Sequence, residues 1–299
     1  MQIKLGIDNG NYNYNYNTKS SEHLLHASGF TMSDREFITS DMQLFYDGAY
    51  YAVGGKRMSF QQDKTKESDS FILSLPSIAH AMKQAGVNEA EIVLGVGLPI
   101  DIYGTQKQAF RDYFLRGDVA FDFEETSYRC HIADCKVFAQ GHAALCRHYN
   151  ALKQYTTITL VDIGGYTVDV LTLREFKVDR GSCGSLRMGT ITLFNAIRGE
   201  LQRENIILSD ALIEDAITGC IQHADSAKIA AIAERHVQHY HRELLNALRE
   251  RGIDLKLPTV FAGGGAELLG GSLISPEVAT VDILDRFANA EGYKLLLGQ

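Results

Sequence analysis

Two short turns in this chain combine an aspartate with glycine in a way that suits a phosphate and a metal ion. Asp8 follows an apolar run at residues 3–7 and is followed by Gly10. Asp162 follows a second apolar run and is followed by Gly164 and Gly165. Glycine has no Cβ, so backbone N–H groups in such turns can approach an anion closely. Because a carboxylate is attracted to a phosphate only through a cation, we expect each aspartate to act on a metal ion or a water.

The chemistry that these residue types support is phosphoryl transfer, which needs neutralised charge, a fixed phosphate and an oriented nucleophile. We expect Asp8 and Asp162 to hold Mg²⁺ mainly through its water shell, because this cation keeps several of its waters. Asn11 and Thr167 can add side-chain hydrogen bonds. The backbone N–H groups expected to clamp the β- and γ-phosphates belong to Gly10, Asn11 and Tyr12 in the first turn and to Gly164, Gly165 and Tyr166 in the second.

A run of three glycines suits the rest of a nucleotide. Residues 259–262 predict an apolar strand, Gly263, Gly264 and Gly265 follow, and a helical pattern begins at Ala266. A strand, a surface made only of backbone and a helix N-terminus together suit a base, a sugar or a phosphate. Each of the three signals is weak by itself, since Asp-Gly turns and glycine runs are common in ordinary hairpins and loops. Their order and their shared strand-turn setting support the interpretation.

The elements that must position these residues repeat along the chain. The first half predicts strands and then helices, and the second half predicts strands, helices, one more strand and a last helix. This pattern indicates an α/β protein with two related halves that face one ligand. The predicted strands are 3–7, 12–16, 45–53, which turns at Asp47 and Gly48, then 91–98, 157–162, 168–173 and 259–262, and the predicted helices are 74–86, 105–115, 140–152, 189–204, 209–218, 226–251 and 288–297.

Bulk properties limit the classes of function. A chain of 299 residues exceeds the usual size of a single core, which favours two domains. The net charge of -8 argues against a direct nucleic-acid surface, which needs clustered Lys and Arg. Five irregularly spaced cysteines fit a reducing compartment, so we expect a cytoplasmic protein. No apolar run approaches the roughly 20 residues of a membrane span, and the N-terminus begins with a core strand rather than a signal peptide, so no membrane partner is expected.

Taken together, the turns resemble the motifs of the actin, Hsp70 and sugar kinase superfamily. Asp8 to Gly10 resembles its first phosphate motif, residues 162–169 its second and residues 261–266 its adenosine motif. Residues 137–145 and 290–295 resemble its two connecting motifs, so the resemblance covers nearly the whole chain. The short length and the run at residues 184–189 are most similar to the bacterial plasmid-segregation actins called ParM or StbA.

This resemblance implies a two-lobed, duplicated fold of the ribonuclease H-like type, with a nucleotide cleft between the lobes. Residues 1–157 with about 283–299 would form domain I, and residues 158–282 would form domain II. Gln140 would position the attacking water, where relatives often carry Glu. A neutral amide orients water without being a strong base, so hydrolysis is expected to be slow and suited to timing.

The resemblance also assigns the helix at 209–218 to the base and ribose, with Glu214 or Asp215 near a hydroxyl. One departure concerns charge, because many actins carry a lysine just beyond the first turn, whereas here the first cation after that turn is Lys19. Either Mg²⁺ neutralises the phosphates without help, or Arg187 or another distant base contributes.

The implied function is a polymerising nucleotidase that uses ATP or GTP with Mg²⁺. Subunits would add head to tail into a helical filament, hydrolysis would weaken it, and an adaptor protein bound to centromere-like plasmid DNA would cap its end. Two alternatives remain open. One is a non-polymerising small-metabolite kinase, for which Asp101 is the candidate base. The other is a nucleotide-dependent scaffold, a class whose members usually add a membrane helix or an inserted subdomain.

Overall fold

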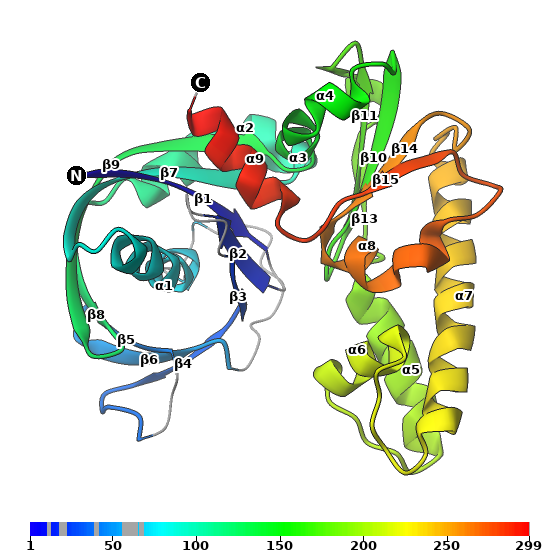
Figure 1. Cartoon of the computed structure of the whole chain (residues 1–299), viewed down its shortest axis with the longest axis horizontal. Coiled ribbons are helices and arrows are strands. Elements are labelled where there is room, and N and C mark those ends of the chain that lie inside the picture. The colour runs from blue at the N-terminus through cyan, green and yellow to red at the C-terminus, as the bar shows by residue number, and fades with distance from the viewer. Residues whose placement is uncertain (11–12, 18–22, 39–41, 56–64, 66–68, 299) are drawn as a thin grey trace. The chain divides into compact units, whose positions relative to one another are not determined.

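The chain divides into two compact units, which we call unit 1 and unit 2 (Figure 1). Unit 1 is Met1–His148 with Phe287–Gln299, and unit 2 is Tyr149–Arg286. The computed structural model describes residues 1–10, 13–17, 23–38, 42–55, 65 and 69–298. The first boundary lies nine residues before the position expected from the sequence, because the short helix at Tyr149–Leu152 belongs to unit 2. There the ring of Tyr149 meets the ring of Phe176 edge-on, with 4.6 Å between centroids.

Unit 1 is built on a sheet whose described strands follow the order β3-β2-β1-β7-β9-β8-β5-β6-β4. The β5–β6 hairpin turns at Asp47 and Gly48, both at positive φ, as the Asp-Gly pair predicts. The strands are β1 (Gln2–Asn9), β2 (Asn13–Asn17), β3 (His23–Ala27), β4 (Phe30–Ser33), β5 (Gln43–Tyr46), β6 (Ala49–Val53), β7 (Glu89–Leu98), β8 (Gly117–Phe123) and β9 (Thr126–Ala139).

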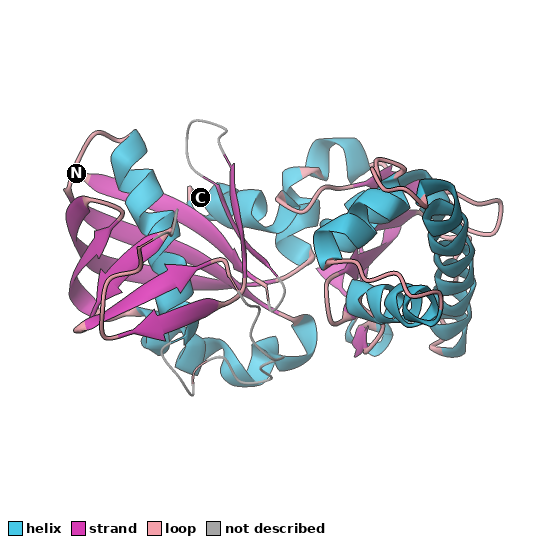
Figure 2. Ribbon diagram, turned by 90° about the horizontal axis from the view of Figure 1, so that it is seen from below, coloured by secondary structure: helices cyan, strands magenta, loops and turns pink. Residues whose placement is uncertain are grey.

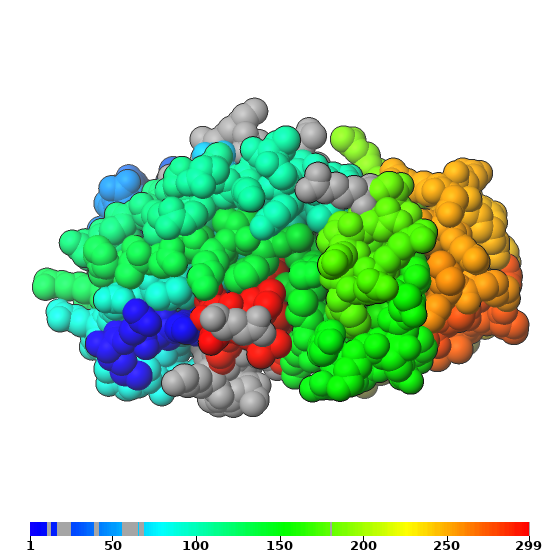
Figure 3. Space-filling view, turned by 90° about the horizontal axis from the view of Figure 1, so that it is seen from above, coloured from blue at the N-terminus to red at the C-terminus, as the bar shows by residue number. Residues whose placement is uncertain are grey.

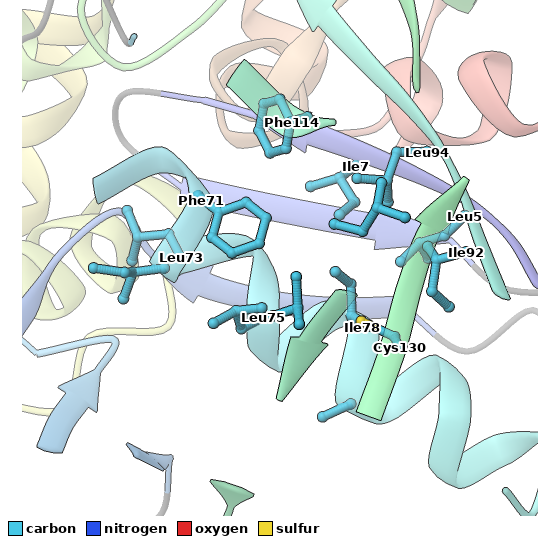
Figure 4. Packing of buried hydrophobic residues seen from close by; sticks show 14 of the residues in the cluster. Leu5, Ile7, Phe71, Leu73, Leu75, Ile78, Ile92, Leu94, Phe114 and Cys130 are labelled. Carbon is cyan, nitrogen blue, oxygen red and sulfur yellow. The ribbon is translucent and has the colours of Figure 1, made fainter. Parts of the chain in front are cut away.

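This sheet curls around helix α1 (Asp69–Gln84), which lies inside the ring of strands (Figure 1). Phe71, Leu75 and Ile78 of α1 are fully buried and lie among side chains of the surrounding strands (Figure 4). A helix enclosed on all sides is apolar all round and shows no single stripe. For that reason the sequence pattern predicted a helix only from residue 74, with Pro76 near its start, whereas Pro76 lies inside α1.

The remaining helices of unit 1 are α2 (Ile100–Phe114), α3 (His142–Arg147) and α9 (Ala288–Leu297). Helix α2 begins directly after Pro99, five residues before the predicted start. The single helix predicted at 140–152 is wrong, because the chain forms α3 and then α4 (Tyr149–Leu152), with a break at His148. That break is where the chain leaves unit 1.

Unit 2 contains a sheet in the order β12-β11-β10-β14-β15, with β13 paired to β11. Its helices lie outside the sheet (Figure 2). The Ser209 hydroxyl accepts a hydrogen bond from Leu212 N at 3.3 Å, which confirms the predicted cap of α6. The strands are β10 (Thr157–Ile163), β11 (Val168–Arg174), β12 (Lys177–Val178), β13 (Gly184–Leu186), β14 (Thr259–Ala262) and β15 (Thr280–Ile283), and the helices are α5 (Thr190–Arg203), α6 (Asp210–Thr218), α7 (Ser226–Glu250) and α8 (Gly263–Leu269), with short 3₁₀ turns at Arg180–Ser182 and Gly270–Leu273.

The two units repeat one strand topology. In unit 1, β3, β2 and β1 form an antiparallel meander, and β7 and β9 continue the sheet in parallel with β1. In unit 2, β12, β11 and β10 form the same meander, and β14 and β15 continue it in parallel. This confirms the duplicated α/β fold expected from the sequence. Because carboxyl ends of parallel strands meet at one edge, each unit brings its acidic turn beside the ends of its parallel strands.

Residues from both ends of the sequence meet inside unit 1. The Lys4 ammonium group donates a hydrogen bond to the carbonyl of Leu297 at 2.8 Å. Figure 3 shows the N-terminal residues, in blue, beside the C-terminal residues, in red. Helix α9 therefore packs against β1 and β7 of this sheet. None of the helices in the described part of the chain is long and apolar enough to cross a membrane.

Candidate functional site

Asp8 and Gln140 meet at the carboxyl edge of the parallel strands of unit 1. Asp8 is the penultimate residue of β1 and is 8% exposed. Gln140 follows β9 directly, and its Nε2 atom donates a hydrogen bond to Asp8 Oδ1 at 2.9 Å. The two residues are far apart in sequence, and the parallel pairing of β1, β7 and β9 brings them together. Gln140 is therefore fixed on the acidic residue of the first turn.

The backbone around Gln140 is held at several points. Gln140 N donates to the carbonyl of Leu98 at 2.9 Å, and the Gln140 carbonyl accepts from His142 N at 2.9 Å. The next residue, Gly141, has a φ of 75°, which favours glycine. The Gly141 N–H donates to Asn289 Oδ1 on α9 at 2.8 Å. The segment between β9 and α3 is thus a defined turn.

The first acidic turn is described up to Gly10. The Ser28 hydroxyl donates to the Gly10 carbonyl at 2.6 Å. A Cβ on Gly10 would collide with the carbonyl of Asn13, so the return of the chain into β2 requires glycine here. Asn11 and Tyr12, expected to add N–H groups to this turn, lie outside the described residues.

The second acidic turn is a tight hairpin closed by the start of α5. Gly164 N donates to the carbonyl of Thr167 at 2.9 Å. The carbonyls of Gly164 and Gly165 accept from Thr190 N at 3.0 Å and from Ile191 N at 2.9 Å. The first N–H groups of α5, which have no partner inside the helix, are therefore satisfied by the turn. Tyr166 lies at the tip of this hairpin and is partly exposed.

Thr167 has a different partner from the one expected. Its hydroxyl donates to Asp169 Oδ2 at 3.2 Å, within the same hairpin. Asp162 is 9% exposed and pairs across the hairpin with Asp169. The Thr167 hydroxyl thus belongs to the internal support of the turn in this structure.

The three glycines form the first turn of α8, whereas the sequence predicted that the helical pattern begins at Ala266. Gly263 has a φ of 89°, and a Cβ there would collide with Asp162 Oδ1. A Cβ on Gly265 would collide with the side chain of Ile163. At Gly264 a Cβ would meet only Arg286 Cβ, at 3.9 Å. Two of the glycines are therefore needed for the close approach of α8 to the end of β10, which puts the Asp162 carboxylate beside the start of α8.

The other candidate residues lie on α6, directly after β13 and on α2. Glu214 is half-buried on α6, a helix that contacts α8. Arg187, considered as a source of positive charge, is exposed just after β13. Asp101, the candidate base of a kinase, is exposed in the first turn of α2. Unit 1 thus brings together Asp8, Gly10 and Gln140.

Unit 2 gathers Asp162, the hairpin tip and the start of α8. Among the described residues, no group of three or more His, Cys, Asp or Glu side chains could hold a metal ion by itself. A nearly buried carboxylate beside a glycine turn fits Mg²⁺, which is commonly held by one or two carboxylates, its own waters and substrate phosphates. Asp8 in unit 1 and Asp162 in unit 2 are each of this kind.

A histidine and a cysteine lie next to Gln140 on α3. Cys146 Sγ is 3.8 Å from His142 Nδ1, one helical turn away. Burial lowers the pKa of His142 and raises the pKa of Cys146. Both shifts favour the neutral groups, whereas a nucleophilic cysteine needs a thiolate beside a cation. This pair is therefore part of the structural support of the site.

Sequence reasoning missed Asn289, which holds the backbone next to Gln140. The signal that could have found it is a polar amide in a short apolar helix, since a buried amide requires partners.

Comparison with protein-family models gives two matches that cover most of the chain. Residues 6–142 match the model for the N-terminal domain of actin-like proteins, and residues 160–275 match the model for the C-terminal part of archaeal MreB-like actin homologues. A search of curated proteins gives no match.

Solved structures with the same fold align over nearly the whole chain. Ta0583, an archaeal actin homologue, is 16% identical over 99% of both chains, with a TM-score of 0.77. A ParM subunit from a 15-stranded filament of Clostridium botulinum is 18% identical over 99% of this chain and 98% of that one, with a TM-score of 0.76. A Bacillus thuringiensis ParM with ATP is 14% identical over 100% and 99%, with a TM-score of 0.74.

Proposed function

This chain belongs to the actin-like superfamily, and we propose that it is a nucleotide-dependent member that binds ATP or GTP with Mg²⁺, hydrolyses it and assembles into a filament. The observation that carries the proposal is the hydrogen bond from Gln140 to Asp8 at the end of β1. It joins a residue that can orient water to a residue that can hold a hydrated cation. The similar structures of Ta0583 with ADP and of Bacillus thuringiensis ParM with ATP make adenine nucleotides the first ligands to test.

The proposed mechanism gives the two atoms of the Gln140 amide different tasks. Its Nε2 atom donates to Asp8, so the Oε1 atom is the one that can accept a hydrogen bond from the attacking water. Asp8 and Asp162 would hold Mg²⁺ through its waters. The cation, when bound, supplies positive charge against the phosphates. The amide is a weak base, so its contribution is orientation and slow turnover is expected.

The turns of unit 2 would hold the phosphates and the nucleoside. The carbonyls of Gly164 and Gly165 accept from the start of α5, and Gly164 N–H closes the hairpin on the Thr167 carbonyl, so we propose the N–H groups of Gly165 and Tyr166 as the anion contacts of this turn. The start of α8 at Gly263, Gly264 and Gly265 would lie along the ribose and the α-phosphate. Glu214 is the proposed partner of a ribose hydroxyl, because α6 contacts α8.

Self-association is proposed as head-to-tail addition of identical subunits. A contact between two different faces of a subunit that does not close into a ring generates a helical filament. The ParM of Clostridium botulinum, which shares this fold, forms a filament. By the same analogy we propose plasmid DNA segregation through an adaptor protein bound to centromere-like DNA, in the cytoplasm, where the five free cysteines would stay reduced.

Light scattering followed by pelleting tests this proposal. The purified protein is mixed with ATP or GTP, with and without Mg²⁺, and phosphate release is recorded in parallel. We expect scattering and pelleted protein to rise only with a triphosphate and Mg²⁺, and to fall as phosphate is released. Binding of neither triphosphate in calorimetry would refute the proposal. Phosphate transfer to a sugar without any rise in scattering would instead favour the kinase alternative.

A further inference from the structure

Asn289 lies in α9, 149 positions after Gln140 in the sequence, yet it contacts the backbone next to it. We propose that Asn289 is a positioning residue for Gln140, which sets the turn between β9 and α3 and so keeps the Gln140 amide on Asp8. This inference rests on the proposed function, in which Gln140 orients the attacking water.

The first observation is the hydrogen bond itself. Asn289 Oδ1 accepts from Gly141 N at 2.8 Å, and both residues are buried, with Asn289 6% exposed. A buried N–H that loses its acceptor has no water to replace it, which makes such a bond costly to remove. The Gly141 N–H and the Gln140 carbonyl belong to one planar peptide group, so the hydrogen bond to Asn289 fixes the orientation of the peptide that follows Gln140.

The second observation is a contact from the next turn of the same helix. Tyr293 lies four residues after Asn289 and so faces the same side of α9. It is fully buried, and its ring stacks on that of Phe138, two residues before Gln140, with 5.8 Å between centroids. A Cβ on Gly97 would collide with the Tyr293 hydroxyl and would lie 3.0 Å from Gln140 Cγ. Tyr293 and the side chain of Gln140 therefore approach the same position on β7.

The third observation is that α9 cannot move without changing these contacts. A Cβ on Gly6 would collide with the carbonyl of Ala290, and a Cβ on Gly292 would collide with the carbonyl of Ala143. Backbone thus lies directly against backbone on two sides of α9. Arg147 at the end of α3 also forms an ion pair with Glu291. Because α9 is held in place by these contacts, Asn289 Oδ1 has a fixed position, which is what a positioning residue requires.

The experiment compares three substitutions in the full chain. Asn289→Leu keeps the branching at Cγ and removes the acceptor. Asn289→Asp keeps an acceptor oxygen, because a buried carboxyl group favours its neutral form and retains a carbonyl. Lys4→Met is the matched control, since it removes a different hydrogen bond to α9, the one to Leu297, without touching Gly141. Asn289→Ser, whose hydroxyl is too short to reach, replaces Asn289→Leu if the leucine variant does not fold.

Two readouts are recorded for each variant. The first is the pair of side-chain NH₂ resonances of Gln140 in the nucleotide-free protein, assigned by their loss in Gln140→Ala. The second is the rate of a single turnover of Mg·ATP, measured beside the ATP dissociation constant. In Asn289→Leu we expect the Gln140 resonances to move to those of a solvated amide and the single turnover to slow about 10- to 100-fold. The dissociation constant should change less than about twofold, Asn289→Asp should recover most of the rate, and Lys4→Met should match the wild type.

The outcomes separate this inference from the proposed function. Unchanged Gln140 resonances and an unchanged rate in Asn289→Leu overturn the inference while the function stands. Shifted Gln140 resonances and a slower turnover in Lys4→Met also overturn the inference. Such a result would mean that any loosening of α9 disturbs Gln140. If the wild type binds no nucleotide but the Gln140 resonances still move in Asn289→Leu and return in Asn289→Asp, the positioning is supported and the proposed function fails.

Discussion

The hydrogen bond between Gln140 and Asp8 limits what other residue types can do at position 140. A glutamate there would place a second carboxylate beside Asp8, and repulsion between the two like charges would raise the pKa of one of them. The amide avoids this conflict. Its cost is a weaker interaction with water, which agrees with the proposal that hydrolysis works as a timer.

Substitutions of Gln140 and Asp162 should separate the orientation of the attacking water from the binding of Mg²⁺. In Gln140→Ala we expect nucleotide binding to persist and the single-turnover rate to fall about 10- to 100-fold, because the water loses its acceptor. In Asp162→Ala we expect Mg²⁺-dependent hydrolysis to be lost. Gln108→Ala, an exposed glutamine on α2, is the matched control. Wild-type turnover in both site variants would show that these residues have other roles.

Buried histidines should make the stability of the fold depend on pH. Burial lowers the pKa of His26 below its usual 6.5. The unfolded chain then binds a proton more readily than the folded one, so the full stability is present above pH 6.5 and is lost as the pH falls towards the folded value. Burial lowers the pKa of His142 and of His241 in the same direction. A histidine as deeply buried as His26 can contribute a slope of up to about 1.4 kcal/mol per pH unit.

His26→Phe tests the largest part of this effect in the core of unit 1. The phenyl ring can keep the stacking on Tyr14, where the ring centroids are 5.5 Å apart, but it does not titrate. Between pH 7.5 and 5.5 the free energy of unfolding, measured with urea, should fall by about 1 kcal/mol less in this variant than in the wild type. His239→Phe, at an exposed position on α7, should leave the wild-type slope. Equal slopes in all three proteins would contradict the prediction.

At the scale of elements, the start of α8 depends on glycine at one position and tolerates alanine at the next. Gly263→Ala would strain a φ of 89° and collide with Asp162, so we expect a loss of about 1–3 kcal/mol in unfolding free energy and weaker nucleotide binding. Gly264→Ala meets no atom nearer than 3.9 Å and should be neutral or slightly stabilising. Thermal unfolding with calorimetric titration measures both. An equal effect of the two substitutions would refute this account of α8.

Local signals predicted the elements whose pattern is complete within a few residues. The Asp47–Gly48 turn, the Ser209 cap and the strand Thr259–Ala262 all depend on neighbouring residues, and the structure has them as predicted. The acidic turn at Asp162 was visible for the same reason, since strand, turn and strand are consecutive. The family motifs supplied the duplicated topology, which the strand orders confirm.

Features that depend on distant residues were not visible in this way. The enclosure of α1 requires a sheet built from strands between β1 and β9 to curl around it. A short stretch of sequence contains no pattern that predicts this enclosure. The break at His148 reflects the passage of the chain into unit 2 rather than a local breaker residue. The role of Asn289 follows from the three-dimensional contact of α9 with Gly141, since an asparagine alone predicts no partner.

At the scale of the whole molecule, unit 2 is a continuous segment, whereas unit 1 needs both ends of the chain. We therefore expect the fragment 149–286 to fold alone and to unfold cooperatively on heating, as judged by circular dichroism. The fragment 1–148 lacks α9, whose buried Ala290, Tyr293 and Leu297 cover β1 and β7, and should not unfold cooperatively. A fragment 1–148 as stable as the full chain would contradict the importance given to α9.

The late return of the chain to unit 1 has a consequence for biosynthesis. A ribosome makes β1 before unit 2 and makes α9 after it, so β1 is synthesised well before the helix that covers it. Unit 2 can be finished while the N-terminal half is still open to proteases and chaperones. If Asn289 positions Gln140 as proposed, the hydrogen bond from Gly141 to Asn289 forms only after α9 has been made, so Gln140 reaches its final orientation late in synthesis.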